Sequence, residues 1–315
     1  MVFLGRLGVL HAVILERNKL VGRKIARLFV AAGATAAYVE QPSEVPALLR
    51  SANVLCGDAF DAEFIAEQVR AHAKLRGVLW TAEPLRRCLR HMSEGRIDHV
   101  LARRDFETPP RAWEVLMVAR RLLDPTTPPL SAFLDWGYLP LELAPRSTAD
   151  RDAAVAKIQE RLGGLQLPKR SVELIGELAH ELLMNAMYDA PVDGKGRPKY
   201  AGDRKAAIML SEPERPTVKL GTDGTRLALQ VRDPFGGLER ARILEALNRG
   251  LAGGELDRSH GGAGLGLTLC HNASSALFFD IARGRYTEVT ALVELDLNQR
   301  ELRTSAKSLH VWSAA

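Results

Sequence analysis

Hydrophobic and polar positions follow two alternating patterns in the first third of the chain. Short apolar runs typical of buried strands alternate with stretches that carry apolar residues every three or four positions, as amphipathic helices do. The runs predict five strands, at residues 11–16, 34–39, 53–57, 77–81 and 99–102. Strands that alternate with helices favour parallel pairing, so the pattern predicts a flavodoxin-like, doubly wound α/β sheet.

A different order of elements follows residue 123. Three prolines in Asp124-Pro-Thr-Thr-Pro-Pro129 end a helix and begin a linker over 124–148, whose aromatic residues predict that it packs on one domain. Helical patterns then cover 148–163 and 172–187. A strand with alternating apolar residues is predicted at 225–232, directly after a Thr-Asp-Gly-Thr turn at 222–225. Further along the chain, a glycine-rich loop at 262–266 precedes an apolar helical run.

A chain of 315 residues exceeds the usual size of one hydrophobic core, which predicts two domains. We expect a first domain at 1–123, the linker at 124–148, a second domain at 149–300 and a loosely held polar tail at 301–315.

Three pieces of the second domain carry candidate chemistry. Glu181 and Asn185 are four residues apart and share a helix face, where an amide oxygen suits Mg²⁺ and a carboxylate can polarise a nucleophile. Asp233 ends the alternating strand and is followed by Gly236 and Gly237, which let the backbone approach a flat ring. The loop Gly262-Ala-Gly264-Leu-Gly266 precedes a helix, where bare amides attract phosphate.

These pieces, in this order, resemble the GHKL or Bergerat-fold ATPases, a family that includes histidine kinases and anti-sigma-factor serine kinases. The resemblance spans roughly 149–297 and implies an α/β sandwich with a mixed, largely antiparallel sheet that binds ATP and Mg²⁺. It implies that Asn185 ligates Mg²⁺, that Glu181 is the catalytic base and that Asp233 accepts from the adenine amino group. The other nucleotide-binding residues that it implies are Gly237, Gly262, Gly264, Leu265, Gly266, Thr287 and Arg258.

Each piece also has a simpler explanation. Glycine loops often serve chain geometry, polar pairs on helices are usually solvated, and Asp233 could only accept turn hydrogen bonds. The middle motif departs from the family pattern because Phe235 stands where glycine is usual. The single helix before the Glu181 motif is more similar to the serine kinase branch than to sensor histidine kinases.

The first domain resembles a response-regulator receiver with an incomplete active site. The positions that match its acidic cluster, phosphoacceptor, hydroxyl and lysine hold Glu16-Arg17, Asp58, Thr81 and Arg103. Arg17 places a positive charge where a metal ion would bind. Arg103 presents a broad, planar guanidinium group where the family has the compact ammonium group of a lysine. We therefore expect a pseudo-receiver, in which Asp58 is either a phosphoacceptor or a helix N-cap.

Charge and composition limit the classes of partner and the cellular environment that we expect for this chain. The formal charge is +5, and residues 86–121 hold nine arginines against five acidic residues. No aromatic-interleaved or helix-turn-helix pattern accompanies them, which argues against nucleic acid and favours a solvated or partner-docking helix. No run reaches the roughly 20 apolar residues of a membrane helix. Three cysteines without pairing or metal spacing suit a reducing cytoplasm.

Two functions remain open at this point. The first is a cytoplasmic ATP-binding signalling protein that acts as a serine kinase or ATPase on a protein partner, such as a sigma-factor or anti-anti-sigma regulator. The second is a non-catalytic interaction module in which ATP, or no ligand, sets the binding surface. A homodimer is compatible with either function.

Overall fold

The computed structural model describes residues 10–138, 140–252 and 265–314. Contacts divide the chain into two compact units. The first unit comprises Met1–Thr127 and Ser305–His310, and the second comprises Pro128–Thr304 and Val311–Ala315. The chain is an α/β protein, and the first unit is completed by a segment that lies almost 180 residues further along the sequence.

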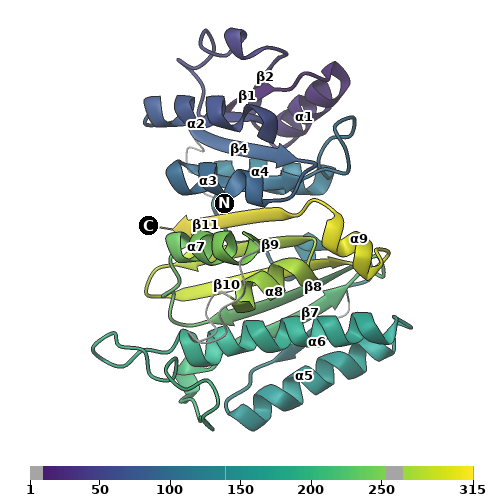
Figure 1. Cartoon of the computed structure of the whole chain (residues 1–315), viewed down its shortest axis with the longest axis vertical. Helices are drawn as coiled ribbons and strands as arrows, with labels where there is room; N and C mark the ends of the chain where they lie inside the picture. Colours follow the sequence, from purple (N-terminus) through teal and green to yellow (C-terminus); the bar gives the residue numbers. More distant parts are fainter. Residues whose placement is uncertain (1–9, 139, 253–264, 315) are drawn as a thin grey trace, which may run out of the picture. The chain divides into compact units, whose positions relative to one another are not determined.

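The first unit is built on five parallel strands in the order β2-β1-β3-β4-β5 (Figure 1). The strands are β1 (His11–Leu15), β2 (Thr35–Val39), β3 (Val54–Asp58), β4 (Arg76–Thr81) and β5 (Ile97–Ala102). All five predicted strands are confirmed, with ends shifted by no more than two residues. The strand order is that of a flavodoxin-like sheet.

Helices cover this sheet on both faces, as the doubly wound pattern requires. The helices are α1 (Lys19–Ala31), α2 (Ala62–Ala71), α3 (Arg86–Glu94) and α4 (Ala112–Leu123). Helix α1 packs against α4, and α2 packs against α3. Alternate strand residues such as Ile14 and Cys56 join the core beneath α1 and α4. The crossover from β2 to β3 has only a 3-10 turn, η1 (Pro42–Glu44).

The expectation of a loosely held C-terminal tail is wrong. Strand β11 (Ser308–Ala314) lies antiparallel to β5, with Leu309 opposite Val100 and His310 opposite His99. The side chains of Leu309 and His310 are fully buried. His310 Nε2 lies 2.8 Å from Glu114 Oε1 on α4, and both side chains are excluded from water. The segment was misread because a polar stretch precedes it.

The second unit contains antiparallel strands in the order β9-β10-β8-β7-β6 (Figure 1). They are β6 (Leu141–Leu143), β7 (Thr217–Thr222), β8 (Arg226–Asp233), β9 (Ala276–Ala282) and β10 (Tyr286–Glu294). Every pairing between these described strands is antiparallel. The hairpin predicted at residues 222–225 is confirmed, because β7 ends at Thr222 and β8 begins at Arg226.

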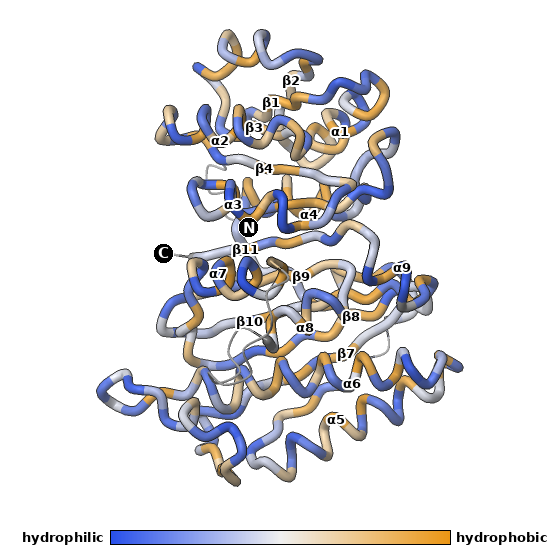
Figure 2. The backbone as a smooth tube through the Cα atoms, viewed as in Figure 1, coloured by the Kyte–Doolittle hydropathy of each residue, from blue (hydrophilic) through white to orange (hydrophobic). Residues whose placement is uncertain are grey.

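Five α-helices are described in this unit, and α5 and α6 are the longest. They are α5 (Thr148–Gly163), α6 (Lys169–Met184), α7 (Arg240–Leu251), α8 (Leu265–Ala273) and the short α9 (Gln299–Thr304). Helix α6 packs against both α5 and α8. Its backbone alternates between orange and blue in Figure 2, as expected of a helix with one buried side. At Gly176 a Cβ would lie 2.2 Å from Gln159 Nε2, so glycine permits the close approach of α6 to α5.

The proline-rich linker packs on the second unit, as its composition predicted. Leu130 and Phe133 are buried, and Phe133 meets Phe278 of β9 edge to face with ring centroids 4.9 Å apart. The segment also supplies β6, which pairs with β7. Only the first residues of the predicted linker, up to Thr127, group with the first unit.

Two further sequence expectations concern the environment of the chain. Within the described ranges no helix is both long enough and apolar enough to cross a membrane. Cys56, Cys88 and Cys270 are all free and buried. Burial raises the pKa of each thiol, to about 12 for Cys88, so these side chains act as core residues.

Candidate functional site

The candidate site begins where α6 ends. Glu181 lies in the last turn of α6, and the chain continues from Asn185 to Asp189 as a single wide turn of π-helix, closed by Ala190 N donating to Asn185 O at 2.9 Å. Such turns are rare and occur often at functional sites. Both side chains are partly buried, and the π turn contacts strand β8.

The amino end of α8 lies directly against this pair. A Cβ on Gly266 would stand 2.5 Å from Glu181 Oε2 and 3.8 Å from Asn185 Oδ1, so a larger residue there would require the Glu181 carboxylate to shift. Glu181 Oε2 is itself buried and has no hydrogen-bond partner in the described parts of the chain. A helix amino end favours negative charge, which explains how this carboxylate oxygen is tolerated there. The structure thus brings Gly266, the last glycine of the third sequence motif, against the first motif.

An arginine that the sequence did not single out enters the same place. Arg204 Nη2 donates to Asn185 Oδ1 at 3.3 Å. The same atom lies 3.4 Å from Asp189 Oδ2 and 3.8 Å from Glu181 Oε2. Burial raises the pKa of Asp189, and the Glu181 carboxylate raises it further against the opposing charge of Arg204. A guanidinium is therefore surrounded by three side-chain oxygens that can accept from it.

The second motif forms a buried acceptor at the end of β8. Asp233 is 6% exposed, and its Oδ1 accepts from the backbone N–H groups of Phe235 at 2.8 Å and Gly236 at 3.2 Å. Burial raises the pKa of Asp233, and these N–H groups oppose the rise. Thr287 faces Asp233 across the β8–β10 pair; its buried hydroxyl makes no hydrogen bond of normal geometry in the described chain.

The geometry of the turn after Asp233 explains why glycine follows Phe235 in this motif. Gly236 has φ +65, and a Cβ there would lie 2.1 Å from Ala282 O. The turn therefore needs glycine at position 236 for its backbone conformation and for its contact with β9. Gly237 has no such restraint, because a Cβ there meets nothing within 4 Å.

Several residues of the predicted phosphate loop lie outside the described residues. These are Arg258, Gly262 and Gly264. Leu265 is the first residue of α8, and its side chain is also outside the description. Helix α7 packs against α8 so closely that a Cβ on Gly250 would overlap the side chain of Thr268.

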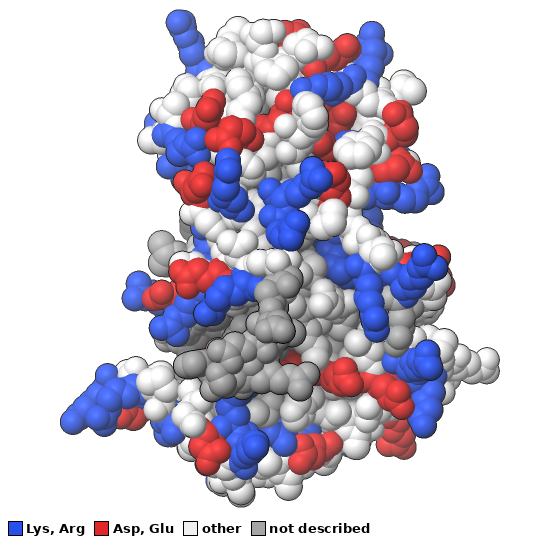
Figure 3. All heavy atoms as spheres, viewed as in Figure 1, with Lys and Arg blue, Asp and Glu red and all other residues white. Residues whose placement is uncertain are grey.

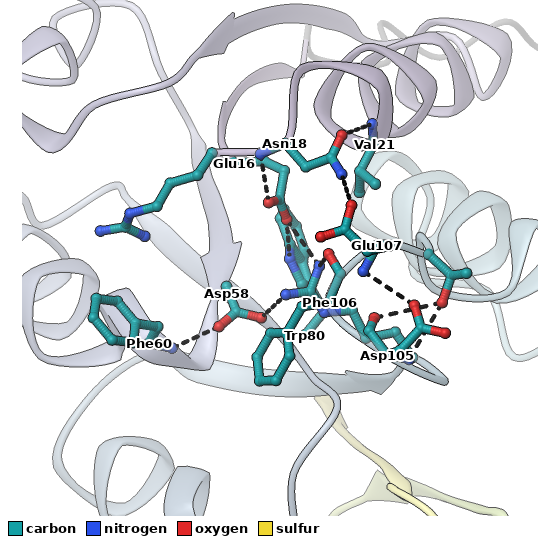
Figure 4. Close-up of polar contacts among 12 residues, drawn as sticks. Glu16, Asn18, Val21, Asp58, Phe60, Trp80, Asp105, Phe106 and Glu107 are labelled. Atoms are coloured by element: carbon teal, nitrogen blue, oxygen red, sulfur yellow. Dashed lines mark hydrogen bonds and ion pairs between the residues drawn. The ribbon is translucent and has the colours of Figure 1, made fainter.

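The first unit has a second polar cluster at the carboxyl ends of its strands (Figure 4). Arg103 contacts Glu16 Oε2 at 3.1 Å and Asp58 Oδ2 at 2.5 Å, and its side chain is 2% exposed. Glu16 also accepts from Trp80 Nε1 at 2.8 Å. The guanidinium therefore occupies the acidic cluster that a receiver would use for a metal ion.

Asp58 has the local role of a cap. Its Oδ1 accepts from Phe60 N at 2.8 Å, which makes it the N-cap of the 3-10 turn η2 (Ala59–Asp61). Burial raises the pKa of Asp58, while the Phe60 N–H and Arg103 oppose that rise. Arg17 turns to Asp61, with Nη2 2.7 Å from Oδ1. Arg17 and Arg103, the two arginines singled out in the sequence, thus both form ion pairs with carboxylates.

Cavities and surface charge do not mark another centre. The cavities described lie at the far end of α6, and the larger, of about 720 Å³, is bordered by the exposed side chains of Arg170, Arg300 and Arg303. On the face shown in Figure 3 positive and negative side chains are interspersed, without one broad basic patch. No group of three His, Cys, Asp or Glu side chains among the described residues is arranged to hold a metal ion.

Comparison with known proteins finds only solved structures of low sequence identity and low TM-score. No family model matches the chain, and no curated protein matches it. Among solved structures, HP1043, an orphan response regulator of H. pylori, is 16% identical over 36% of this chain and 98% of its own, with TM-score 0.30. A response regulator from Thermotoga maritima is 11% identical over 37% and 98%, with TM-score 0.32. A chain of the SiaB-SiaC complex from Pseudomonas aeruginosa is 13% identical over 50% and 89%, with TM-score 0.31.

Two site residues were missed in the sequence. Asp189 follows Asn185 by the same four-residue step that separates Asn185 from Glu181, so its place on one helix face could have been read from the spacing. Arg204 gave no such signal. It lies in a charged loop, and only the folding of that loop back toward α6 brings it to the site.

Proposed function

We propose that the second unit binds ATP with Mg²⁺ and that the chain is a signalling regulator acting on a protein partner, as a serine kinase does. The observation that carries this proposal is the contact of Gly266 with Glu181 and Asn185, since it joins the first turn of α8 to a candidate metal ligand and a candidate base. Asp233, on the neighbouring strand β8, supplies a buried acceptor.

The residues fit a magnesium nucleotide in their donor chemistry. Asn185, Glu181 and Asp189 present the hard oxygen atoms that Mg²⁺ prefers, and the orphan oxygen of Glu181 is the kind of buried group that a cation or its water would satisfy. Bound Mg²⁺ would neutralise charge on the phosphates. The buried hydroxyl of Thr287 lies beside Asp233, where an adenine edge could offer both a donor and an acceptor.

The roles of the side chains follow from their positions. Asn185 would hold the metal ion through Oδ1. Glu181, one turn away, would orient or deprotonate the acceptor hydroxyl of the partner. Asp233 would select adenine by accepting from its amino group. The amides at the start of α8 would stabilise negative charge that develops on the transferred phosphoryl group.

A non-catalytic interaction module is the second candidate. It is favoured by one specific observation, that arginine side chains occupy both polar clusters, Arg103 in the first unit and Arg204 in the second. In that case the nucleotide would only set the conformation of a docking surface.

Titration with a fluorescent ATP analogue, with and without Mg²⁺, tests the nucleotide site. We expect Asp233→Ala to weaken binding by roughly tenfold or more, because a hydrogen bond to a charged group contributes about 1.5–3 kcal/mol. Asn185→Ala should remove the effect of Mg²⁺. Asn248→Ala, an exposed position on α7, is the matched control and should bind as wild type does. Equal affinity in all four proteins would refute the assignment.

Catalysis is tested separately. With radiolabelled ATP, label on a co-purified partner that disappears in Glu181→Gln, while nucleotide affinity is kept, would support a kinase. Retained nucleotide binding with neither transfer nor hydrolysis in the wild type would favour the interaction module.

A further inference from the structure

We infer that Arg204 occupies the cation position of the candidate nucleotide site, and that its side chain must leave before a divalent cation can bind to Asn185. This rests on the proposed function, and it adds a competition that the sequence motifs do not contain. Arg204 is then a positioning residue that sets how strongly nucleotide binding depends on metal.

The contacts of Arg204 fit a stand-in for a metal ion. Its Nη2 atom lies 3.3 Å from Asn185 Oδ1, 3.4 Å from Asp189 Oδ2 and 3.8 Å from Glu181 Oε2. These are the oxygen donors that would surround a divalent cation, supplied by one stripe of α6 and its π turn. A guanidinium and a metal ion cannot share the same oxygen without strong repulsion, so the two must compete.

The contacts are also loose enough to be released. The Arg204 side chain is 21% exposed, and its one hydrogen bond in the described chain is long, at 3.3 Å. Arg103 in the first unit provides the contrast, with contacts of 2.5 and 3.1 Å and a side chain only 2% exposed. Arg103 is fixed in its cluster, whereas Arg204 can leave at moderate cost.

The backbone around Arg204 is anchored, so the side chain can swing while the loop stays in place. Tyr188, in the π turn, donates its hydroxyl to Ala206 O at 2.8 Å. At the other end of the loop, Lys199 Nζ lies 2.6 Å from Glu214 Oε1. These contacts fix the chain on both sides of Arg204. Once released, its charge remains near enough to meet a nucleotide phosphate.

This arrangement predicts an opposite effect of Arg204 in the two metal states. Without metal, the guanidinium attracts phosphate and supports nucleotide binding. With metal, it has to be displaced and so weakens the gain that the metal provides. The ratio of nucleotide affinity with Mg²⁺ to affinity without it should therefore be small in the wild type, and it should rise about tenfold in Arg204→Ala.

The matched control is Arg197→Ala. Arg197 lies in the same loop, but its ion pair joins it to Asp193 at 2.8 Å, away from the site. Its removal should leave the ratio unchanged. Arg204→Lys keeps a cation in place and should keep the ratio close to that of the wild type, which separates the effect of charge from any disturbance of folding.

Titration of the nucleotide-free protein with Mn²⁺, followed by electron paramagnetic resonance, gives a readout that needs no nucleotide. Arg204→Ala should bind Mn²⁺ more tightly than the wild type and Arg197→Ala, and Asn185→Ala combined with Arg204→Ala should lose that gain. Nucleotide binding by none of the proteins would refute the proposed function, and the Mn²⁺ titration would still decide the competition. An unchanged Mn²⁺ affinity in Arg204→Ala, or an unchanged affinity ratio, would overturn the inference.

Discussion

Removal of the Arg103 guanidinium is the sharpest test of how the first unit is held together. Arg103→Met keeps most of the side-chain volume and deletes the charge that lies between Glu16 and Asp58. The three side chains are 2%, 5% and 9% exposed, so the two carboxylates would be left in a nearly dry environment without their cation. Removing one member of a buried ion cluster costs about 3–5 kcal/mol, because the remaining charge is uncompensated.

The predicted loss can be read from urea unfolding. At an m-value of about 2 kcal/mol per molar, a loss of this size lowers the unfolding midpoint by roughly 2 M. Tryptophan fluorescence is a suitable signal, since Trp80 is buried and donates to Glu16. Arg104→Met is the matched control. Arg104 is 82% exposed and contacts Asp105 at the surface, so its loss should change stability by less than about 1 kcal/mol.

The pH dependence provides a second check. Burial raises the pKa of Asp58, and Arg103 opposes that rise, so the pKa should rise further in the variant. A carboxyl group whose pKa is higher in the folded state destabilises the fold when it is ionised, and this penalty disappears as pH falls through the raised pKa. The deficit of Arg103→Met should therefore be largest near pH 8 and shrink in acid. An unchanged midpoint at pH 8 would refute the reasoning.

Three further predictions follow from the geometry. Gly236→Ala should lower stability by at least about 2 kcal/mol in thermal unfolding, because it combines a positive φ with a backbone clash, while Gly237→Ala, in open space, should have little effect. Acetyl phosphate should leave no adduct on Asp58 in intact mass measurement, since Arg103 and the Phe60 N–H already engage its oxygens; a stable phosphate mapped to Asp58 would contradict the pseudo-receiver. Adenine nucleotide affinity should fall on acidification, because protonation of Asp233 removes the acceptor for the adenine amino group. Burial raises the pKa of Asp233, so the fall should occur at a higher pH than for an ordinary aspartate, and Asp233→Asn should lose this pH dependence.

Strand and helix positions were largely readable from the sequence, for a physical reason. Parallel strands of the first unit are buried on both faces and therefore appear as short continuous apolar runs, as in Val54–Asp58. Strand β8 is bounded by a turn with glycine at Gly224 and by the polar end at Asp233. Local signals of this kind survive in the sequence. The pairing of β11 with β5 does not, because it joins residues that are about 200 positions apart.

The candidate site was readable only in part. Spacing predicted that Glu181 and Asn185 share a face, but not that Gly266 would stand against them. Arg204 escaped notice because its role depends on the path of a whole loop. Likewise, the sequence marked Arg103 as an unsuitable replacement for lysine, whereas the structure gives it two carboxylate partners. Charge compensation between distant segments is a tertiary property that a local pattern does not carry.

The antiparallel strand β11 has a consequence for biosynthesis. Because Ser305–His310 belongs to the first unit, the edge of β5 stays uncovered on the ribosome until those residues have been translated. Until then Glu114 also lacks its partner His310. In a fragment that stops at Thr127 the edge of β5 would stay unpaired, and it could form backbone hydrogen bonds with strands of other chains. Expression of the first unit by itself therefore requires that the segment at 305–310 be joined back onto it.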